Sequence, residues 1–451
     1  MLADCPDIQP PPGAETRTES AGCPSKPGVD AVERSGNGGG DAAPEGAPRY
    51  IANRVTPPGD IWTANDWRTQ RYERRQRSSE WLIRGARLEA GLPAVAAAGE
   101  GSRASETGWV RPPRPARCRW RVGENVGVHH SGDVDKGAHW SGIERCASIW
   151  ACPVCSAVIR AERANDIQAA VEKWQQEDNH LVFVTLTMRH RKTDKLDVTL
   201  NAALKAWQRI CQGKAWEKFK ARFGVRGYVR AVEVTLGENG WHPHIHALLF
   251  TDRPMTKADQ DALSSALFDR WVTYVQKFGG GMPTKLRGID VRPATKDGKV
   301  IAQYLGKLQE QKTTPPDQGI GKEMARFDFK TGRGSSLTPF ELLDSTGEDE
   351  NTFAAYRLWN EFVAATKGRR AITWSKGLRD LVALEDEKTD EEILEESEQD
   401  DLIFLVPGQI YDRIKNAPAL LAYVLESVEK GDVETALAVL SGAPPSRAKA
   451  A

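Results

Sequence analysis

Long hydrophobic runs are absent from this chain of 451 residues. No stretch of about 18 apolar residues occurs, which excludes a membrane-spanning helix and predicts a protein without a membrane partner. The first residues, MLADCPDIQPPPGAE, lack the basic and apolar regions of a signal peptide. Cysteine is scarce, with seven residues, so a disulfide framework is not expected. These absences predict a cytoplasmic protein whose cysteines are reduced thiols or metal ligands.

A net charge is also missing, because Lys+Arg and Asp+Glu both number 62. The charges are nevertheless unevenly distributed along the chain. Acidic residues gather in 385–401, whereas the middle of the chain is basic. This asymmetry favours contact between the middle of the chain and a polyanion such as a nucleic acid. The basic residues of the middle include Arg111, Arg114, Arg117, Arg119, Arg121, Arg189, Arg191, Lys192 and Arg230.

Composition divides the chain into successive regions. The N-terminal region is rich in Gly, Pro, Ala and Ser and has little apolar surface to bury, so most of it is predicted to be disordered. One piece of it, 61–92, has the composition of a basic helix. The predicted regions are a mostly disordered 1–108, a Cys-rich module 109–165, a core 166–312, an extension of that core 313–384, and an acidic segment with C-terminal helices 385–451.

Hydrophobic periodicity predicts an α+β core. The order of elements is β-α-β-β-α-β-α, and its first six match the split βαβ, or ferredoxin-like, arrangement with an antiparallel sheet. Helices would cover one face of this sheet and leave the other face free for a ligand. The predicted strands are 181–187, 227–236, 241–250 and 288–293, and the core helices are 195–222, 256–278 and 297–311. Further helices are predicted near 157–175, 351–366, 375–384 and 408–441.

Three of the eight histidines fall within the five residues HPHIH. Alternate side chains of a strand share one face, so His242, His244 and His246 point the same way. Imidazoles spaced about 7 Å apart along such a face can bind one divalent cation. The alternative is a row of surface histidines, but such clustering favours a metal site.

The hairpin before these histidines supplies a carboxylate. If Asn239 and Gly240 are the two turn residues, Glu233 lies directly opposite His246. A one-residue slip would move Glu233 to the other face. Two imidazoles and one carboxylate suit Mg²⁺ or Mn²⁺ acting on phosphate oxygens.

The segment GKVIAQYLGKLQEQ carries Tyr304 and Lys307, which share a helix face at a spacing of three residues. A tyrosine beside a metal-polarised phosphate can attack phosphorus, and a neighbouring ammonium can lower the phenol pKa. A helical tyrosine taken alone is more often a packing residue, so this interpretation depends on the histidine cluster.

Four cysteines form a second metal-binding pattern. The CPVC pair has zinc-knuckle spacing, and four thiolates would complete a closed tetrahedral zinc site. Buried free cysteines are the alternative, and a histidine could replace the first cysteine. The predicted structural zinc ligands are Cys118, Cys146, Cys152 and Cys155, with His129, His130 or His139 as substitutes for Cys118.

Together these motifs resemble those of rolling-circle replication initiators of plasmids in the HUH endonuclease superfamily, and more narrowly the actinobacterial plasmid type. The resemblance spans roughly 109–405. Its motifs are FVTLT at 183–187, GWHPHIH at 240–246 and AQYLGK at 302–307, with further similarity in CASIWACPVC at 146–155, TPFELL at 338–343 and GRRAITWSKGLR at 368–379.

The resemblance implies a DNA nicking-joining endonuclease built on a five-stranded antiparallel sheet. It implies that His244 and His246 bind Mg²⁺ or Mn²⁺, with Glu233 or His242 as the third ligand. Tyr304 would cut one strand of plasmid origin DNA, keep the 5′ phosphate and leave a 3′ hydroxyl for a host polymerase working with a host helicase. Val300 stands where some relatives carry a termination glutamate, so the resemblance leaves the termination step open.

Two other functions fit parts of this pattern. A single-tyrosine transposase or a conjugative relaxase would use the same chemistry, although relaxases usually place the tyrosine before the histidines. A zinc-containing DNA-binding regulator without catalysis would use the cysteines but would not need Tyr304.

Overall fold

The structure is a computed structural model that describes residues 64–94, 110–131, 137–294, 336–347, 349–396 and 400–442. All of them belong to one unit, Gly46–Ala451. The predicted helix 297–311 and most of the predicted disordered region lie outside the described residues. No described helix is long and apolar enough to cross a membrane.

The central element is a five-stranded antiparallel sheet with the order β6-β3-β5-β4-β7. The predicted α+β class with an antiparallel sheet is therefore confirmed. Four strands fall where periodicity predicts them, and the short edge strand β7 is an addition. The strands are β3 (His180–Leu186), β4 (Val225–Gly237), β5 (Gly240–Thr251), β6 (Ile289–Ala294) and β7 (Ile372–Trp374).

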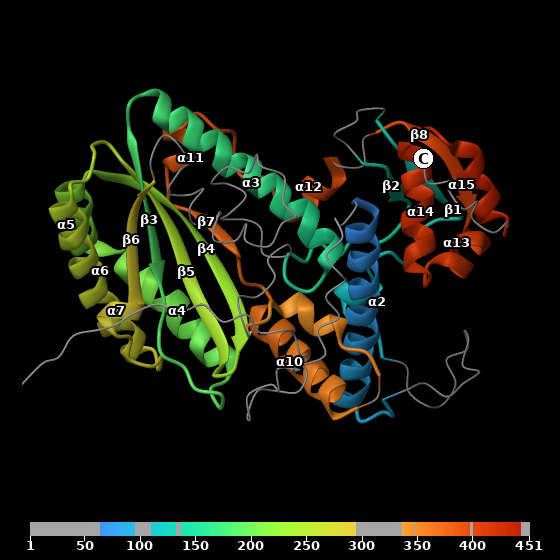
Figure 1. The fold of residues 1–451 in the computed structure, drawn as a ribbon, viewed down its shortest axis with the longest axis horizontal. Coiled ribbons are helices and arrows are strands. Elements are labelled where there is room, and N and C mark those ends of the chain that lie inside the picture. Colours follow the sequence, from blue (N-terminus) through green and yellow to red (C-terminus); the bar gives the residue numbers. More distant parts are fainter. Residues whose placement is uncertain are drawn as a thin grey trace, which may run out of the picture. The chain divides into compact units, whose positions relative to one another are not determined.

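Three helices pack against one face of this sheet (Figure 1). They are α4 (Leu196–Ile210), α5 (Gly213–Phe223) and α6 (Lys257–Lys277). The single helix predicted over 195–222 is thus two helices, and the second one begins at Gly213, which adopts a positive φ of 73°. The helix predicted over 256–278 is α6, and it buries one stripe that consists of Leu263, Leu267, Trp271 and Val275.

The opposite face is only partly open, in contrast to the prediction. Helix α3 (Pro153–Gln176) covers one end of it, where the Trp174 ring meets the Phe250 ring at 5.7 Å. The residues of β5 at the end covered by α3 are apolar, whereas the other end of the strand carries the histidines. The sequence could not indicate this cover, because α3 belongs to the segment before the sheet.

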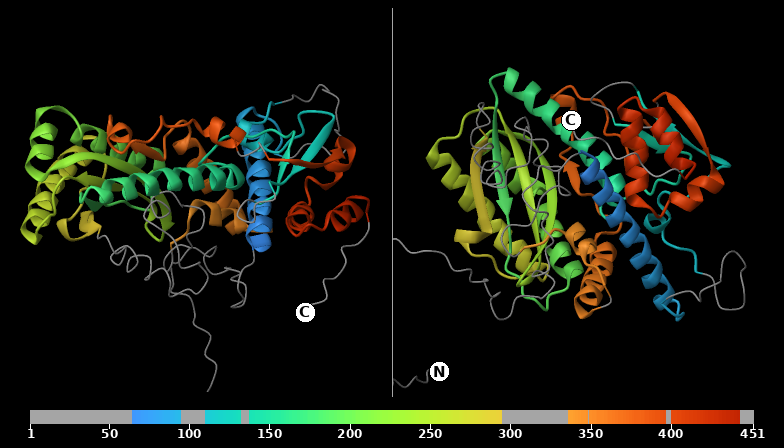
Figure 2. Two further views of the ribbon diagram at one scale, coloured as in Figure 1. Left: turned by 90° about the horizontal axis from the view of Figure 1, so that it is seen from above. Right: turned by 45° about the vertical axis from the view of Figure 1, so that its right-hand side comes forward.

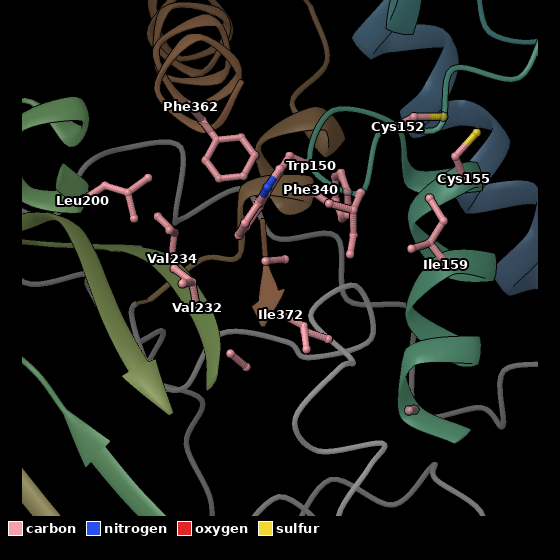
Figure 3. Packing of buried hydrophobic residues seen from close by; sticks show 14 of the residues in the cluster. Trp150, Cys152, Cys155, Ile159, Leu200, Val232, Val234, Phe340, Phe362 and Ile372 are labelled. Atoms are coloured by element: carbon pink, nitrogen blue, oxygen red, sulfur yellow. The ribbon is translucent and has the colours of Figure 1, made fainter. Parts of the chain in front are cut away.

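A second helical layer packs around the hairpin end of the sheet. It consists of η2 (Pro339–Asp344) and α10 (Glu350–Thr366). The Phe362 ring of α10 stacks on Trp241 at 5.9 Å. The buried hydrophobic residues around Phe362 form one continuous cluster with those at the start of α3, such as Ile159 (Figure 3).

A three-stranded sheet joins distant parts of the chain, and the sequence did not predict it. Strand β1 (Asn125–His129) pairs with β2 (His139–Ser141) and with β8 (Leu402–Pro407). Figures 1 and 2 show the early strands beside the late one. Its core includes Trp140 and Tyr411, whose rings lie 5.5 Å apart. Three helices complete this part and lie within the predicted helical region 408–441: α13 (Gly408–Ile414), α14 (Pro418–Glu429) and α15 (Val433–Leu440).

The basic helix expected within 61–92 is present as α2 (Ala64–Glu89). Several of its arginines form internal contacts. Arg68 pairs with Glu429 at 2.5 Å, and Arg74 pairs with Asp344 at 2.5 Å. These ion pairs therefore connect α2 to other elements of the fold. The remaining short helices are η1 (Arg114–Arg117), α7 (Lys285–Gly288), α11 (Leu378–Leu381) and α12 (Asp390–Glu396).

Candidate metal centres

The histidines lie on β5, next to β4, in a register that differs from the predicted one. Glu233 pairs with His244, and the turn residues are Glu238 and Asn239. Gly240 supplies the positive φ of 84° that follows such a turn, whereas neither turn residue has a positive φ. The observed pairing is therefore shifted by two residues along β5 relative to the predicted pairing. Because side chains alternate with a period of two, Glu233 stays on the histidine face.

Three side chains form a group with the geometry of a cation site. The ligand atoms of Glu233, His244 and His246 all lie within 4.8 Å of one another. One carboxylate oxygen of Glu233 is 2.9 Å from the Nε2 atoms of both histidines. The side chains are 15%, 12% and 9% exposed, respectively. The group is therefore sheltered, while a small part of each side chain remains exposed.

The other nitrogen of each imidazole is also engaged. The Nδ1 atom of His246 lies 3.1 Å from the hydroxyl of Thr185, and that of His244 lies 3.2 Å from the carbonyl of His242. Such partners hold the rings in orientation and leave Nε2 for a cation. Thr185 was missed as a site residue by sequence reasoning, although it belongs to FVTLT and pairs with His246 across the sheet.

The third histidine, His242, stands outside this group of three. Its ring stacks on His190 at 4.8 Å and lies 5.1 Å from the ring of His244. Burial, with the neighbouring His244 and His190, lowers the pKa of His242 to about 3. The ring is thus neutral at physiological pH and packs beside the ligand group.

The four predicted cysteines form a second group. All four are buried, and their sulfur atoms lie within 4.8 Å of one another. Cys152 caps the N-terminus of α3 and Cys155 lies in its first turn (Figure 3). Cys118 follows η1, and Cys146 lies in the segment between β2 and α3. Cys118, rather than one of the histidines considered as substitutes, completes the group.

The spacing of the sulfur atoms fits a tetrahedral metal ion. Cys118 lies 3.6 Å from both Cys152 and Cys155, and Cys146 lies 3.7 Å from Cys155. A tetrahedron with zinc–sulfur bonds of about 2.3 Å has edges of about 3.8 Å. The group therefore needs little rearrangement to hold such an ion.

The four thiols also share their protons unevenly. Hydrogen bonds from the other thiols, chiefly Cys146, lower the pKa of Cys118. Hydrogen bonding to Cys118 raises the pKa of Cys146 and Cys152. A buried cluster that favours one thiolate and resists further ionisation would be fully deprotonated only with a cation at its centre.

Helix α2 holds the backbone around the cysteines. The Arg75 guanidinium donates to the Cys118 carbonyl at 2.8 and 3.2 Å, and the Ser78 hydroxyl donates to the Ala151 carbonyl at 2.9 Å. Two of the segments that supply thiols are thus fixed by a helix from outside the predicted module.

The arginines near the cysteines make internal contacts. Arg114, Arg117 and Arg121 pair with Glu391, Glu144 and Asp412, respectively. The side chain of Arg119 is buried, with its guanidinium 4.1 Å from the centre of the Tyr72 ring. These four arginines were predicted as part of a surface for a polyanion; three of them are paired with acids of the chain and Arg119 is buried, although the Arg114 side chain remains 52% exposed.

The predicted tyrosine motif cannot be described from the structure. Tyr304, Lys307 and Val300 lie outside the described residues. A hollow of about 820 Å³ lies elsewhere, where α2, η2 and α10 meet. Its lining includes Glu73, Asp344 and other acids but neither metal-binding group, so we do not regard it as the functional site.

Comparison with known proteins identifies relatives of the chain. A family model described as Replication protein matches residues 143–277. A protein of Streptomyces lividans named Protein rep is 32% identical over 312 residues, covering 56% of this chain and 67% of that protein. A Neomycin resistance protein of Streptomyces cyanogenus is 36% identical over 133 residues, covering 24% and 30%. A Protein rep of Lentilactobacillus hilgardii is 25% identical over 118 residues, covering 26% and 36%. No solved structure matches the chain.

Proposed function

Because the chain belongs to the family of plasmid replication initiators, we propose that it starts rolling-circle replication by nicking one strand of origin DNA. The observation that carries this proposal is the group formed by Glu233, His244 and His246 on the central hairpin. A protein that only bound DNA would have no need of a sheltered pair of imidazoles converging on a carboxylate.

The strand order of the central sheet supports an HUH-type core. The order β6-β3-β5-β4 with antiparallel pairing is that of a ferredoxin-like sheet, and His244 and His246 lie on its central strand β5. The histidine face lies away from α4 and α6, because the intervening Ile245 is buried among the residues of those helices. A single strand of DNA can therefore approach the site from the side opposite those helices.

Glu233, His244 and His246 are the residues that would hold Mg²⁺ or Mn²⁺ in this function. Such a cation, when bound, polarises the scissile phosphate and stabilises its developing charge. Thr185 keeps the His246 ring in place, since its hydroxyl occupies Nδ1 and leaves Nε2 for the cation side.

Tyr304 is the proposed nucleophile. Its phenolic oxygen forms a bond to phosphorus while the bond from phosphorus to the 3′ oxygen breaks. The phenol gives up its proton, the departing 3′ oxygen gains one, and the 5′ phosphate remains on the tyrosine. The Lys307 ammonium stabilises the phenolate. A host polymerase, working with a host helicase, extends the 3′ hydroxyl. A reversal of the same transfer then rejoins the displaced strand.

The four-cysteine group is proposed to be a structural zinc site. Closed sets of four thiolates are typical of structural zinc, and the sulfur spacing fits its bond length. Zinc there would fix the N-terminus of α3, whose other end packs on the sheet through Trp174.

The alternatives predict different outcomes. A transposase or relaxase would share the chemistry, but the family match favours the initiator. A regulator without catalysis would bind the origin without forming any covalent link to it.

A nicking assay on single-stranded origin oligonucleotides with Mn²⁺ tests the proposal. Wild type should form a protein–DNA adduct that both Tyr304→Phe and His246→Ala abolish. An adduct that survives Tyr304→Phe would move the nucleophile to another residue. Duplex binding without an adduct on any oligonucleotide would contradict the nickase and favour the regulator.

A further inference from the structure

A short basic loop lies beside the histidine site and takes no part in the chemistry described above. It comprises residues 189–192, Arg-His-Arg-Lys, directly after β3 and the two residues that follow it. Arg189, Arg191 and Lys192 are exposed. In the described part of the chain, no ion pair joins any of these three side chains to an acid. This contrasts with the arginines near the cysteines, which have acidic partners or are buried.

The loop is fixed to the metal hairpin at its His190. The Nδ1 atom of this residue lies 2.9 Å from the carbonyl of Asn239 in the β4–β5 turn. Its ring stacks on His242 at 4.8 Å, and His242 lies 5.1 Å from the ligand His244. Only two ring contacts therefore separate the loop from the cation ligands.

Glycines allow the backbone of the loop to lie close to its neighbours. A Cβ atom on Gly240 would come within 3.0 Å of the Lys192 Cα atom. On the other side Arg189 forms a β-bridge with Gly281, where a Cβ atom would lie 2.3 Å from the Arg189 carbonyl oxygen. The loop is thus held between two glycines, and a hydrogen bond from the Arg191 amide to Asp194, at 2.8 Å, stabilises its turn.

We propose that this loop is the site at which the single-stranded DNA backbone is held next to the nick. Arg189, Arg191 and Lys192 bind the phosphates that flank the scissile one, and His190 is the positioning residue that holds them beside the metal hairpin. Exposed cations without acidic partners contact phosphate at no cost in broken ion pairs, and their binding to DNA is not sequence-specific. The inference rests on the proposed nickase function, because it assigns a substrate-binding role beside that same site.

A triple variant, R189A/R191A/K192A, tests the proposal through equilibrium binding. Fluorescence anisotropy with a single-stranded origin oligonucleotide in EDTA measures affinity without cleavage. We expect roughly 10- to 30-fold weaker binding, and a plot of log K against log salt that is shallower by about 2, since each single-strand phosphate contact contributes about 0.7. The double variant R191Q/K192Q keeps the Arg189 side chain and should lose part of this affinity with the fold intact.

The matched control removes three exposed lysines from the helices on the other face of the sheet. Lys205, Lys214 and Lys218 lie on α4 and α5 and are exposed. Their replacement by alanine changes the net charge equally and should alter affinity less than twofold. Equal losses in the two triple variants, or no loss in the loop variant, would overturn the proposal.

The positioning role of His190 has its own test. His190→Ala keeps all three charges but removes the contacts to Asn239 and His242. We expect the KM for the oligonucleotide to rise severalfold, whereas kcat changes much less. A fall in kcat alone would show that His190 acts elsewhere.

These results separate the loop from the nickase. If wild type forms no adduct but the loop variant still loses binding, the nickase proposal fails and the loop stands as a DNA-binding site. If wild type forms the adduct and the loop variant binds normally, only the loop proposal fails.

Discussion

The two candidate metal groups differ in how the fold builds them. The cysteines come from separate segments before and at the start of α3, and the most exposed of them shows only 5% of its surface. The histidine group comes from one hairpin, and Glu233 is 15% exposed. A fully enclosed set of four ligands leaves no position for a substrate, whereas a group of three at a sheet surface does. We therefore propose that the first group stabilises the fold and that the second carries the chemistry.

The largest effect is expected from removing a thiolate. Cys155→Ser should abolish zinc binding and unfold the region around η1 and the start of α3, because structural zinc contributes on the order of 10 kcal/mol in small domains. Metal analysis and thermal unfolding measure this. Cys211→Ser is the matched control, because Cys211 is a free cysteine that does not belong to the four-cysteine group. Unchanged zinc content in Cys155→Ser would contradict a four-cysteine site.

The next largest effect is expected from replacing a histidine of the group formed by Glu233, His244 and His246. His246→Ala should lower the nicking rate by about 10³-fold, because the cation that stabilises the phosphate is no longer held. Zinc content and the melting temperature should remain close to those of wild type. His180→Ala, at the far end of β3 opposite Thr251, should nick normally. A parallel loss of zinc in His246→Ala would remove the distinction between the two groups.

A smaller effect is expected from Thr185, which contacts the ligand His246 but is not itself a ligand. Thr185→Val keeps the shape of the side chain but removes the hydroxyl beside His246. Manganese affinity should fall about 10- to 100-fold, and saturating Mn²⁺ should restore nicking. Thr187→Val provides the control, because its hydroxyl donates to the Arg287 carbonyl. Full activity of Thr185→Val at limiting Mn²⁺ would rule out this supporting role.

The smallest effect is expected near the cysteines. Arg121 and Asp412 form an ion pair whose side chains are 32% and 38% exposed. Pairs of this kind contribute less than about 1 kcal/mol. Arg121→Ala should therefore change the melting temperature slightly and origin affinity less than twofold. A strong loss of DNA binding would show that this region contacts the origin after all.

The sequence predicted those parts of the site that depend on local spacing. Alternation in HPHIH placed His244 and His246 on one face, and the CPVC pair with two further cysteines gave the second group. The hairpin register was wrong by two residues, because the positive φ falls on Gly240 after the turn rather than within it. The face assigned to Glu233 survived this error because strand side chains repeat every two residues.

The parts that could not be predicted depend on contacts distant in sequence. The pairing of β1 with β8 joins segments near residues 127 and 405, and no local pattern links them. The acidic partners of Arg114 and Arg121 could not be recognised from the local sequence, because Glu391 and Asp412 lie far along the chain. Thr185 is a site residue only because strand pairing sets it against His246.

The most direct test of the difference between the two groups is stepwise metal removal from one preparation. Dialysis against EDTA should abolish nicking of an origin oligonucleotide while about one zinc per chain remains, because four buried thiolates release their ion slowly. Adding Mn²⁺ should then restore nicking without changing the zinc content. If zinc and activity are instead lost together, and Mn²⁺ restores neither, then the assignment of chemistry to the histidine hairpin and of stability to the cysteines is contradicted.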